Sequence, residues 1–380
     1  MTRTGTVRAL PNLLLGVASV AVAVGAVEAY LRATGYNPMQ ALLDGRELIV
    51  RASPDPLRRY EGTPFGSGVA WRARVELNSH GFRDDEHPVA KGEGVYRIAV
   101  LGDSIAFGNF LSVEETFPAR LERLFRSAQA QDRVEVVNMA MGGYDTLQEV
   151  ATLEAVGTRF RPDLVVVAFC FNDVGTDAIN LEYIEKAATY GSSPIYALRV
   201  AQLVRASLDR FSGRYASREP IGDAEFLAAN ADHVEDVGDD ARLRSRIEAL
   251  EAALARGRDP HGFAPLYASP ARIGKLRHAL GRLRELGRAH GFGVLGLIVP
   301  VLDGRPENAD LYRAAYAIVA GEFERQGFGV VSLHPEFSAA GLDGLRRWSD
   351  DLLHPDARGH RLIAERLYQE VRRLREESQR

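Results

Sequence analysis

The sequence predicts a three-layer α/β/α fold in which helices cover both faces of a doubly wound, five-stranded parallel sheet. Five short apolar runs from Tyr96 onward alternate with amphipathic segments, and this alternation is typical of parallel sheets. Hydrophobic residues make up 46% of the 380 residues, which suffices for a large buried core. An apolar run near the N-terminus and a long strand-free stretch in the middle add a transmembrane helix and a helical insertion.

The apolar run near the N-terminus indicates where the protein resides. Residues 1–9 contain Arg3 and Arg8 and no acid, so we expect them to remain in the cytoplasm. Residues 10–31 contain the stretch LLLGVASVAVAVGAVEAYL, which is long enough to cross the hydrocarbon core of a bilayer. The sequence therefore predicts a single-pass membrane anchor, with the bulk of the chain outside the cytoplasm.

Two other interpretations of this run stay open. Cleavage after Ala21–Ala23 would make it a signal peptide and the mature protein secreted or periplasmic. The run could also be a buried core helix, although it is apolar all round. Glu28 interrupts it close to its end, where a carboxylate at the membrane edge costs little free energy.

Residues 32–92 are expected to connect the anchor to the main domain. Most of this juxtamembrane segment is rich in Pro, Gly and Arg and reads as loop, whereas residues 69–84 alternate apolar and polar positions as a short hairpin does. We expect the segment to pack against the main domain, which occupies residues 93–380.

The five apolar runs have the length and composition of strands that are covered on both faces of a sheet. They span residues 96–102, 133–140, 162–173, 292–301 and 328–333.

Amphipathic segments predict helices between and after these strands. The clearest begins after Ser269, which we expect to cap it, starts at Pro270 and stops at Gly291. The other helices are predicted over residues 115–128, 146–160, 309–327 and 356–377.

A stretch at about residues 175–268 contains no good strand and is too long for a plain connection. Residues 192–211 and 241–257 within it have the pattern of amphipathic helices. This helical insertion is either an elaboration that buries its own apolar stripe or a lid or substrate-binding wall, and spacing alone does not choose between them.

Composition and motifs exclude several classes of protein. A net charge of −4 leaves no long basic surface, so no nucleic-acid partner is expected. Cys170 is the only cysteine, which excludes an intramolecular disulfide and a C-x-x-C metal or redox site. The chain has no P-loop, no H-E-x-x-H, no G-x-S-x-G elbow and no G-x-G-x-x-G after a strand. We therefore expect no metal and no cofactor.

Polar and glycine residues follow four of the five predicted strands. The first strand ends in Gly102-Asp103-Ser104, the second is followed by Gly142-Gly143, and the third ends in Asn172-Asp173. The block WSDDLLHPDARGH lies between the fifth strand and the last helix. Open α/β sheets bind ligands outside the carboxyl ends of their strands, so we expect these residues to meet at one edge.

These residue types suit acyl transfer. A serine hydroxyl is a weak nucleophile until a base takes its proton, and His354 is the candidate base for Ser104. Asp351, three residues before it, can orient the imidazole and stabilise its charged form. Three donors are available for a developing oxyanion: the backbone N–H of Ser104, the backbone N–H of Gly143 and the side-chain amide of Asn172.

Four blocks of the sequence resemble, in the same order, those of the SGNH (GDSL-type) hydrolase superfamily. Two further stretches, NSHGFRD and VEETFPARLE, are similar to a membrane-anchored, extracytoplasmic branch of that family. The third block departs from the usual G-x-N-D pattern, because Cys170 stands where the pattern has glycine. This difference affects the expected backbone geometry at that position, but the asparagine of the pattern is present as Asn172. The blocks are G-D-S at 102–104, NMAMGG at 138–143, FND at 171–173 and D-x-x-H at 351–354.

The resemblance covers roughly residues 93–175 and 292–375. It implies a flavodoxin-like sheet, a nucleophile at Ser104, a triad completed by Asp351 and His354, and oxyanion donors at Gly143 and Asn172. By the same likeness, the substrate is a small acyl ester of a carbohydrate or lipid, hydrolysed through an acyl-serine intermediate. Two alternatives are an O-acyltransferase of cell-envelope glycans with the same triad and a non-catalytic envelope scaffold.

Each candidate also has a purely structural interpretation. Ser104 could merely cap a helix, and His354 could merely precede one. His360 is a rival base, but it falls inside the last predicted helix. Asp350 is a rival for Asp351, because adjacent aspartates cannot be separated by inspection.

Other polar residues near the blocks are expected to have structural roles. Asp103 and Asp173 are expected to accept hydrogen bonds from loop amides, and Cys170 to be a small core residue. Asn78 and Arg83 could line the site, but a surface hairpin explains them more simply.

Overall fold

Five parallel strands form the central sheet of the computed structural model, as the apolar runs predict. The order across the sheet is β6-β5-β7-β8-β9, so the second strand in the chain lies on one side of the first and the later three on the other. This is the doubly wound order, whose switch point lies between β5 and β7. The bounds are β5 Tyr96–Gly102, β6 Val134–Asn138, β7 Leu164–Phe169, β8 Gly293–Ile298 and β9 Gly329–Ser332.

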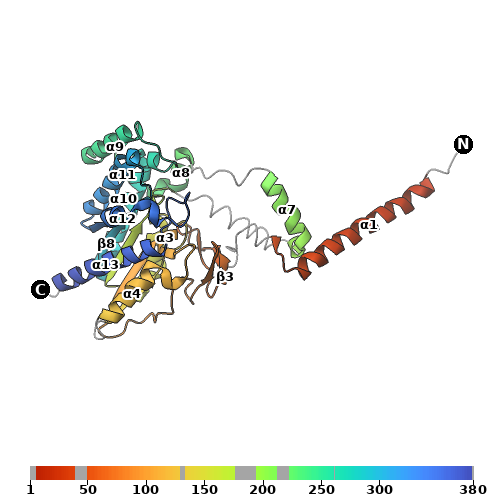
Figure 1. Ribbon diagram of the computed structural model, residues 1–380, viewed down its shortest axis with the longest axis horizontal. Helices are drawn as coiled ribbons and strands as arrows, with labels where there is room; N and C mark the ends of the chain where they lie inside the picture. The colour runs from red at the N-terminus through yellow and green to blue at the C-terminus, as the bar shows by residue number, and fades with distance from the viewer. Residues whose placement is uncertain are drawn as a thin grey trace.

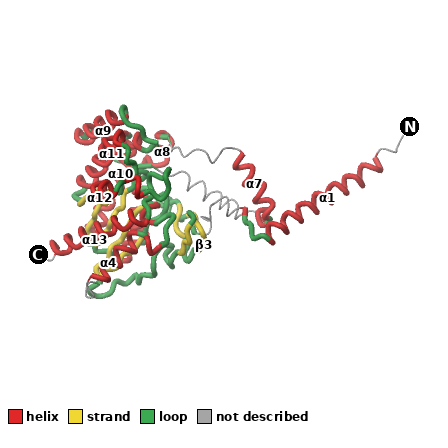
Figure 2. Tube along the Cα trace, in the orientation of Figure 1, coloured by secondary structure: helices red, strands yellow, loops and turns green. Residues whose placement is uncertain are grey.

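The described part of the chain comprises residues 6–38, 49–128, 133–175, 194–211, 222–260 and 262–378. Figure 2 shows the strands enclosed between helices, with the N-terminal helix extending away from them. The predicted insertion at about 175–268 therefore lies partly outside the described residues.

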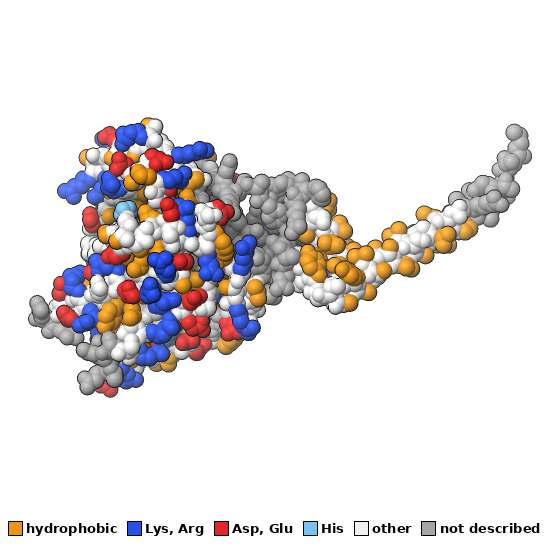
Figure 3. Space-filling model, viewed as in Figure 1, with side chains coloured by type: hydrophobic (Ala, Val, Ile, Leu, Met, Phe, Trp, Pro, Cys, Tyr) orange, Lys and Arg blue, Asp and Glu red, His pale blue; other side chains and the backbone are white. Residues whose placement is uncertain are grey.

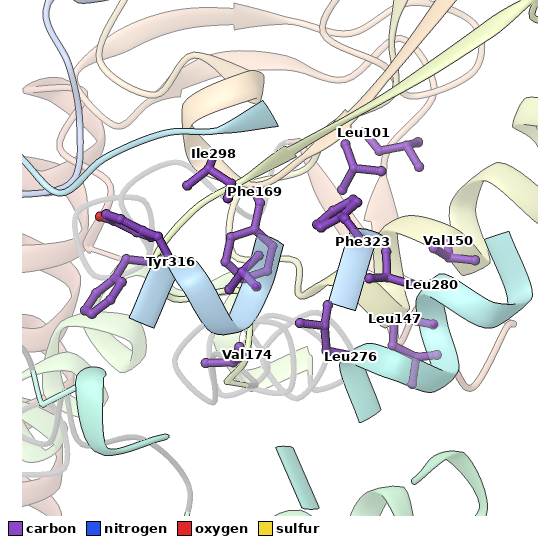
Figure 4. Packing of buried hydrophobic residues seen from close by; sticks show 14 of the residues in the cluster. Leu101, Leu147, Val150, Phe169, Val174, Leu276, Leu280, Ile298, Tyr316 and Phe323 are labelled. Carbon is purple, nitrogen blue, oxygen red and sulfur yellow. The ribbon is translucent and has the colours of Figure 1, made fainter. Parts of the chain in front are cut away.

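One face of the sheet is covered by helices from the middle of the chain. Side chains of β7 such as Val165 and Phe169 pack there against Leu276, Leu280 and Phe323 in one large cluster (Figure 4). β7 consists almost wholly of buried Val, Ala and Phe, because both its faces meet helices. The covering helices are α5 Thr146–Ala155, α10 Pro270–His290 and α11 Ala309–Arg325, and α9 Ala241–Leu254 packs against α11.

The opposite face is covered by helices that come from the two ends of the main domain. A second cluster joins Val100 and Val166 of the sheet to Phe117, Leu121 and Leu367 of these helices. The helices are α4 Phe117–Ala128 and α13 Ala357–Ser378, with the short α3 Ser104–Phe107 and α12 His334–Ala340 beside them. Two apolar layers thus sandwich the sheet and fix the three-layer fold.

The helix that was predicted between Ser269 and Gly291 has the expected bounds. Pro270 is its first residue, and Gly291 follows its end with a φ of 77°. Ser269 occupies the N-cap position, but its side chain makes no capping hydrogen bond, so that part of the expectation is wrong. Pro270 has no N–H and fits the first turn without such a bond.

Residues 49–92 fold into two small antiparallel hairpins that lie against the main domain. The first pairs β1 Val50–Ala52 with β2 Tyr60–Gly62, and the second pairs β3 Ser67–Ala70 with β4 Ala73–Glu76. Tyr60 donates a hydrogen bond from its hydroxyl to the Gly142 carbonyl at 2.9 Å, which ties the first hairpin to the loop after β6.

Arg83 is not on the surface, contrary to the simpler expectation for this segment. Its guanidinium is buried and donates to the carbonyls of Gly108 at 2.5 Å, Leu111 at 2.6 Å and Phe107 at 3.2 Å. Burial lowers the pKa of Arg83 to about 10, which still leaves it charged at neutral pH. The side chain thereby holds the segment that follows α3.

The N-terminal helix α1 spans Thr6–Ala33 and is apolar over Pro11–Ala33, long enough to cross a membrane by length and composition. Its apolar window is fully exposed to solvent in the isolated chain. Helix α7, Arg199–Phe211, contacts the C-terminal part of α1, and both lie apart from the sheet (Figure 1). The short α8, Asp223–Asn230, is the next helix in the chain.

Candidate active site

Ser104 is the first residue of α3, directly beyond the carboxyl end of β5. Asp103 occupies the N-cap position, and its Oδ1 accepts a hydrogen bond from the Ile105 N–H at 3.0 Å. Gly102 is required where strand meets helix, because a Cβ there would lie 2.7 Å from the Cβ of Ala106. The turn therefore presents the Ser104 hydroxyl at the edge of the sheet.

Two residues from the other end of the domain complete a chain of hydrogen bonds to this hydroxyl. His354 Nε2 lies 2.9 Å from Ser104 Oγ, and His354 Nδ1 lies 2.9 Å from Asp351 Oδ2. With the Nδ1 proton on the carboxylate side, neutral His354 offers a lone pair at Nε2 to the serine proton. Ser104, His354 and Asp351 thus form one continuous series of hydrogen-bonding contacts.

Asp351 is held in place by its own loop. Its Oδ1 accepts the backbone N–H groups of Leu353 and His354, each at 3.0 Å. Burial alone would raise the pKa of Asp351, but hydrogen bonds from the His354 ring and from the backbone N–H groups of His354 and Leu353 help to leave the pKa below its ordinary value. The neighbouring Asp350 is exposed, so Asp351 and not Asp350 faces the imidazole.

Asn172 reaches the same place from the loop after β7. Its Nδ2 donates to Asp103 Oδ2 at 3.2 Å, and the same carboxylate oxygen lies 3.0 Å from Ser104 Oγ. Asp103 thus links Ser104 to Asn172, in keeping with the structural role expected for it. Asp173 likewise accepts from the Cys170 N–H at 2.5 Å, which closes the loop behind Asn172.

Gly143 lies in the turn that follows β6, with a φ of 81° that favours glycine. This turn is joined to the end of β5 by a hydrogen bond from the Met141 N–H to the Gly102 carbonyl at 3.1 Å. Within the described segments, the N–H groups of Gly143 and Ser104 donate no hydrogen bond.

Two other candidates from the sequence lie elsewhere. His360 is buried in α13, where its Nδ1 accepts the Phe117 N–H at 3.1 Å, and burial chiefly lowers its pKa to about 3. Its Nδ1 is therefore occupied by the start of α4. Burial also raises the pKa of the Cys170 thiol well above its usual value, as expected for a small core residue and not for a nucleophile.

Sequence reasoning missed an aromatic wall beside the imidazole. The ring of Phe110 stands edge-on to His354 at 5.1 Å and to Trp348 at 4.7 Å between centroids. Phe110 has a φ of 68°, a strained value for a bulky residue. The block WSDDLLHPDARGH contains Trp348, which was the available signal, whereas nothing around Phe110 marked it.

Two buried acids, Glu149 and Asp173, lie close enough to Asp103 for their charges to interact with it. Glu149 on α5 has no hydrogen-bond partner among the described residues for either carboxylate oxygen. Burial, reinforced by the charge of Asp103, raises the pKa of Glu149 and of Asp173 well above their ordinary values. Within the described segments, no group of three or more His, Cys, Asp or Glu side chains is arranged to hold a metal ion.

Comparisons with known proteins give one family and several similar folds. The model of the GDSL-like Lipase/Acylhydrolase family matches residues 100–362. A search of curated proteins finds no match. Similar solved structures include LAE5, an α/β hydrolase enzyme from the metagenome of Lake Arreo in Spain, with 14% identity over 72% of this chain and 93% of that one and a TM-score of 0.40.

Two further similar structures are esterases. Axe2, an acetylxylan esterase from Geobacillus stearothermophilus, has 14% identity over 73% of this chain and 94% of that one, with a TM-score of 0.40. EstA, a psychrotrophic esterase from Pseudoalteromonas sp., has 12% identity over 73% of this chain and 97% of that one, with a TM-score of 0.39.

Proposed function

Because this chain belongs to the GDSL-like lipase/acylhydrolase family and is therefore a carboxylic ester hydrolase, we propose that Ser104, His354 and Asp351 are its catalytic triad. The observation that carries the proposal is the continuous contact from Ser104 Oγ to His354 Nε2 and from His354 Nδ1 to Asp351, with both separations at 2.9 Å. Groups 250 residues apart in the chain meet within hydrogen-bonding distance.

In the first half of the reaction, His354 Nε2 takes the proton of Ser104 as Oγ attacks the carbonyl carbon of the ester. Asp351 stabilises the imidazolium that forms. The negative oxygen of the tetrahedral intermediate accepts hydrogen bonds from the N–H groups of Ser104 and Gly143 and from the Asn172 amide. The C–O bond then breaks, and the alcohol leaves with the proton from His354.

The second half removes the acyl group from Ser104. Water loses a proton to His354 Nε2 and attacks the acyl-serine, and the carboxylic acid leaves as the serine regains its proton. In the acyltransferase alternative, a sugar hydroxyl takes the place of water. Product analysis with an added sugar acceptor distinguishes the two, because transfer yields a new sugar ester and hydrolysis yields free acid.

We infer a small acyl ester of a carbohydrate or lipid as the substrate. Phe110 and Trp348 support this inference, because flat apolar rings beside the base suit a sugar face or a short acyl chain. We also infer that α1 anchors the enzyme in a membrane with the main domain outside the cytoplasm. The exposed apolar residues from Pro11 to Val27 and the basic residues before them support that location.

A fluorophosphonate probe tests the nucleophile. We expect it to label the full chain and the control variant Ser112→Ala, whose serine is exposed, and to spare Ser104→Ala. The Ser104→Ala change should also lower kcat on a soluble ester by about three or more orders of magnitude. Labelling of Ser104→Ala equal to that of the natural chain would refute this assignment, and absence of labelling in folded natural chain would favour the scaffold alternative.

A further inference from the structure

Exposed apolar side chains gather on one segment outside α1. Four of them lie on α7 and on the 3-10 helix η4, Pro194–Ala197, or between the two. Monomeric soluble proteins rarely expose such groups together, and a patch of this kind marks an interaction surface. The side chains and their exposed fractions are Ile195 at 59%, Leu198 at 44%, Val204 at 55% and Leu208 at 59%.

The start of α7 is bound to the C-terminal end of α1 by several polar contacts. The Glu28 carboxylate accepts the Val200 N–H at 2.9 Å and thereby satisfies one of the unpaired donors at the start of α7. Arg199 donates to the Leu31 carbonyl at 2.7 Å, and Arg32 donates to the Ala197 carbonyl at 3.1 Å. These bonds fix α7 to one level along α1.

That level is the outer boundary of the proposed membrane span. A helix rises about 1.5 Å per residue and a hydrocarbon core is about 30 Å thick, so a span that begins at Pro11 ends near Glu28 to Arg32. Glu28 also pairs with Arg32 at 2.6 Å, so the one carboxylate in the apolar run has its partners at the boundary. The start of α7 is therefore held where headgroups meet acyl chains.

Helix α7 turns crosswise to α1 at this junction and does not continue it (Figure 1). Ala206 is buried, whereas Val204 and Leu208, one helical turn apart, are exposed. Figure 3 shows hydrophobic side chains continuing from α1 onto its junction with α7. An amphipathic helix in this position has the properties of one that lies in a membrane surface.

We propose that η4 and α7 form an interfacial element whose exposed apolar face inserts into the outer surface of the lipid bilayer. The proposal rests on the membrane location given under the proposed function. The patch is continuous with the lipid-facing surface of α1 and is bound to the end of the span. Lipid is therefore the occupant that the anchored chain brings into contact with it.

This element also belongs to the segment that follows the candidate oxyanion residue. The chain runs from Gly175, three residues after Asn172, through residues 176–193 to η4. The interfacial element is therefore connected along the chain to the loop after β7.

Quenching of tryptophan by brominated lipid tests the proposal in the full chain. The protein is reconstituted in phosphatidylcholine vesicles with and without dibrominated acyl chains, at a lipid excess that leaves about one molecule per vesicle. The test variants are Leu208→Trp and Val204→Trp, either of which suffices if the other fails to fold. Val20→Trp in α1 controls for the anchor, and Leu227→Trp, an exposed leucine of α8, controls for the main domain.

We expect bromolipid to remove most of the emission that Leu208→Trp, Val204→Trp and Val20→Trp add to the native Trp71 and Trp348 signal. Leu227→Trp should lose no more than the natural chain does. Quenching of Val20→Trp without quenching of either α7 variant overturns the interfacial element and keeps the anchor. If none of Leu208→Trp, Val204→Trp and Val20→Trp is quenched, both the interfacial element and the membrane anchor are overturned. Quenching of Leu227→Trp as strong as that of Leu208→Trp overturns a lipid contact specific to α7. Hydrolysis of a soluble ester by the same samples reports separately on the esterase.

Discussion

At the scale of single residues, the carboxylate of Asp351 determines which nitrogen of the His354 ring carries the proton. Asp351 accepts on both sides, from the imidazole through Oδ2 and from two backbone N–H groups through Oδ1. Its pKa lies below the ordinary value, so it remains a carboxylate at neutral pH and can only accept. In the neutral ring Nδ1 must then carry the proton, so that Nε2 faces Ser104 Oγ with its lone pair.

An Asp351→Asn variant should separate this electrostatic role from the loop geometry. The amide oxygen can keep the backbone bonds of Leu353 and His354, while the amide nitrogen donates to Nδ1 and moves the imidazole proton to Nε2. We expect kcat to fall by about three to four orders of magnitude with little change in stability. Asp350→Asn is the matched control and should keep the natural rate. Equal rates for both variants would show that Asp351 does not orient the base.

The adjacent aspartates also mark a limit of sequence reasoning. Asp350 and Asp351 differ by one position, and only the turn that folds Asp351 Oδ1 onto two backbone N–H groups determines which of them meets His354. Phe110 was missed for a related reason, because its position depends on a positive φ that no local pattern encodes. The positions of Ser104 and Asn172 at the edge of the sheet were predictable, because each follows a strand that could be recognised from its apolar run.

At the scale of secondary-structure elements, the long strands and helices could be predicted from their apolar patterns. The short helices and the contact between α7 and α1 could not. All five strands and the long helices α10, α11 and α13 were recognised, because burial imposes a period on many consecutive residues. The short helices α8 and α12 were not foreseen, because two turns carry too few positions for a pattern. The contact between α7 and α1 depends on a tertiary contact between Glu28 and Val200 that spacing does not reveal.

Helix α5 provides a prediction about pH, because it carries the buried Glu149. Burial raises the pKa of Glu149 well above its ordinary 4.5, so the folded protein keeps a proton that the unfolded chain releases. The contribution of Glu149 to the free energy of unfolding is therefore greatest below its ordinary pKa of 4.5. It falls as the pH rises above that value, by at most about 1.4 kcal/mol per pH unit. We therefore expect Glu149→Gln to raise the free energy of unfolding above that of the natural chain, and by more at pH 8 than at pH 5.

Urea titration in detergent at the two pH values measures this difference. Glu154→Gln on the same helix is the matched control. A hydrogen bond from Arg282 lowers the pKa of Glu154, so Glu154 is ionised at both pH values. Its replacement should therefore change the free energy of unfolding by the same amount at pH 5 and at pH 8. A Glu149→Gln effect that is equal at pH 5 and pH 8 would contradict a protonated Glu149.

At the scale of the whole molecule, the segment before the sheet contributes to the folding of the main domain. Trp71, at the tip of the second hairpin, packs edge-on against Phe107 of α3 at 5.4 Å, and Arg83 binds three carbonyls around the end of that helix. The sequence places the start of the main domain at residue 93. These contacts lead us to expect that the folding unit begins near residue 49.

Two fragments test this boundary. Residues 49–380 should be obtained as a folded protein with a cooperative thermal transition, followed by circular dichroism. Residues 93–380 should lack one, because losing Arg83 leaves buried carbonyls unpaired at a cost of about 1–3 kcal/mol each and losing Trp71 and Tyr60 uncovers apolar surface. Both fragments contain α7, so its exposed face affects them alike. Equal transition midpoints would place the boundary at 93 instead.

β6, one of the two edge strands of the sheet, has side chains where a neighbouring strand would otherwise pair. Glu122 accepts the outward N–H of Val136 at 3.1 Å, and Asp84 accepts that of Asn138 at 2.8 Å. An incoming strand from another molecule would have to displace two carboxylates to bind there. Neighbouring copies of the chain would therefore lack a template at this edge of the sheet for stacking into larger aggregates.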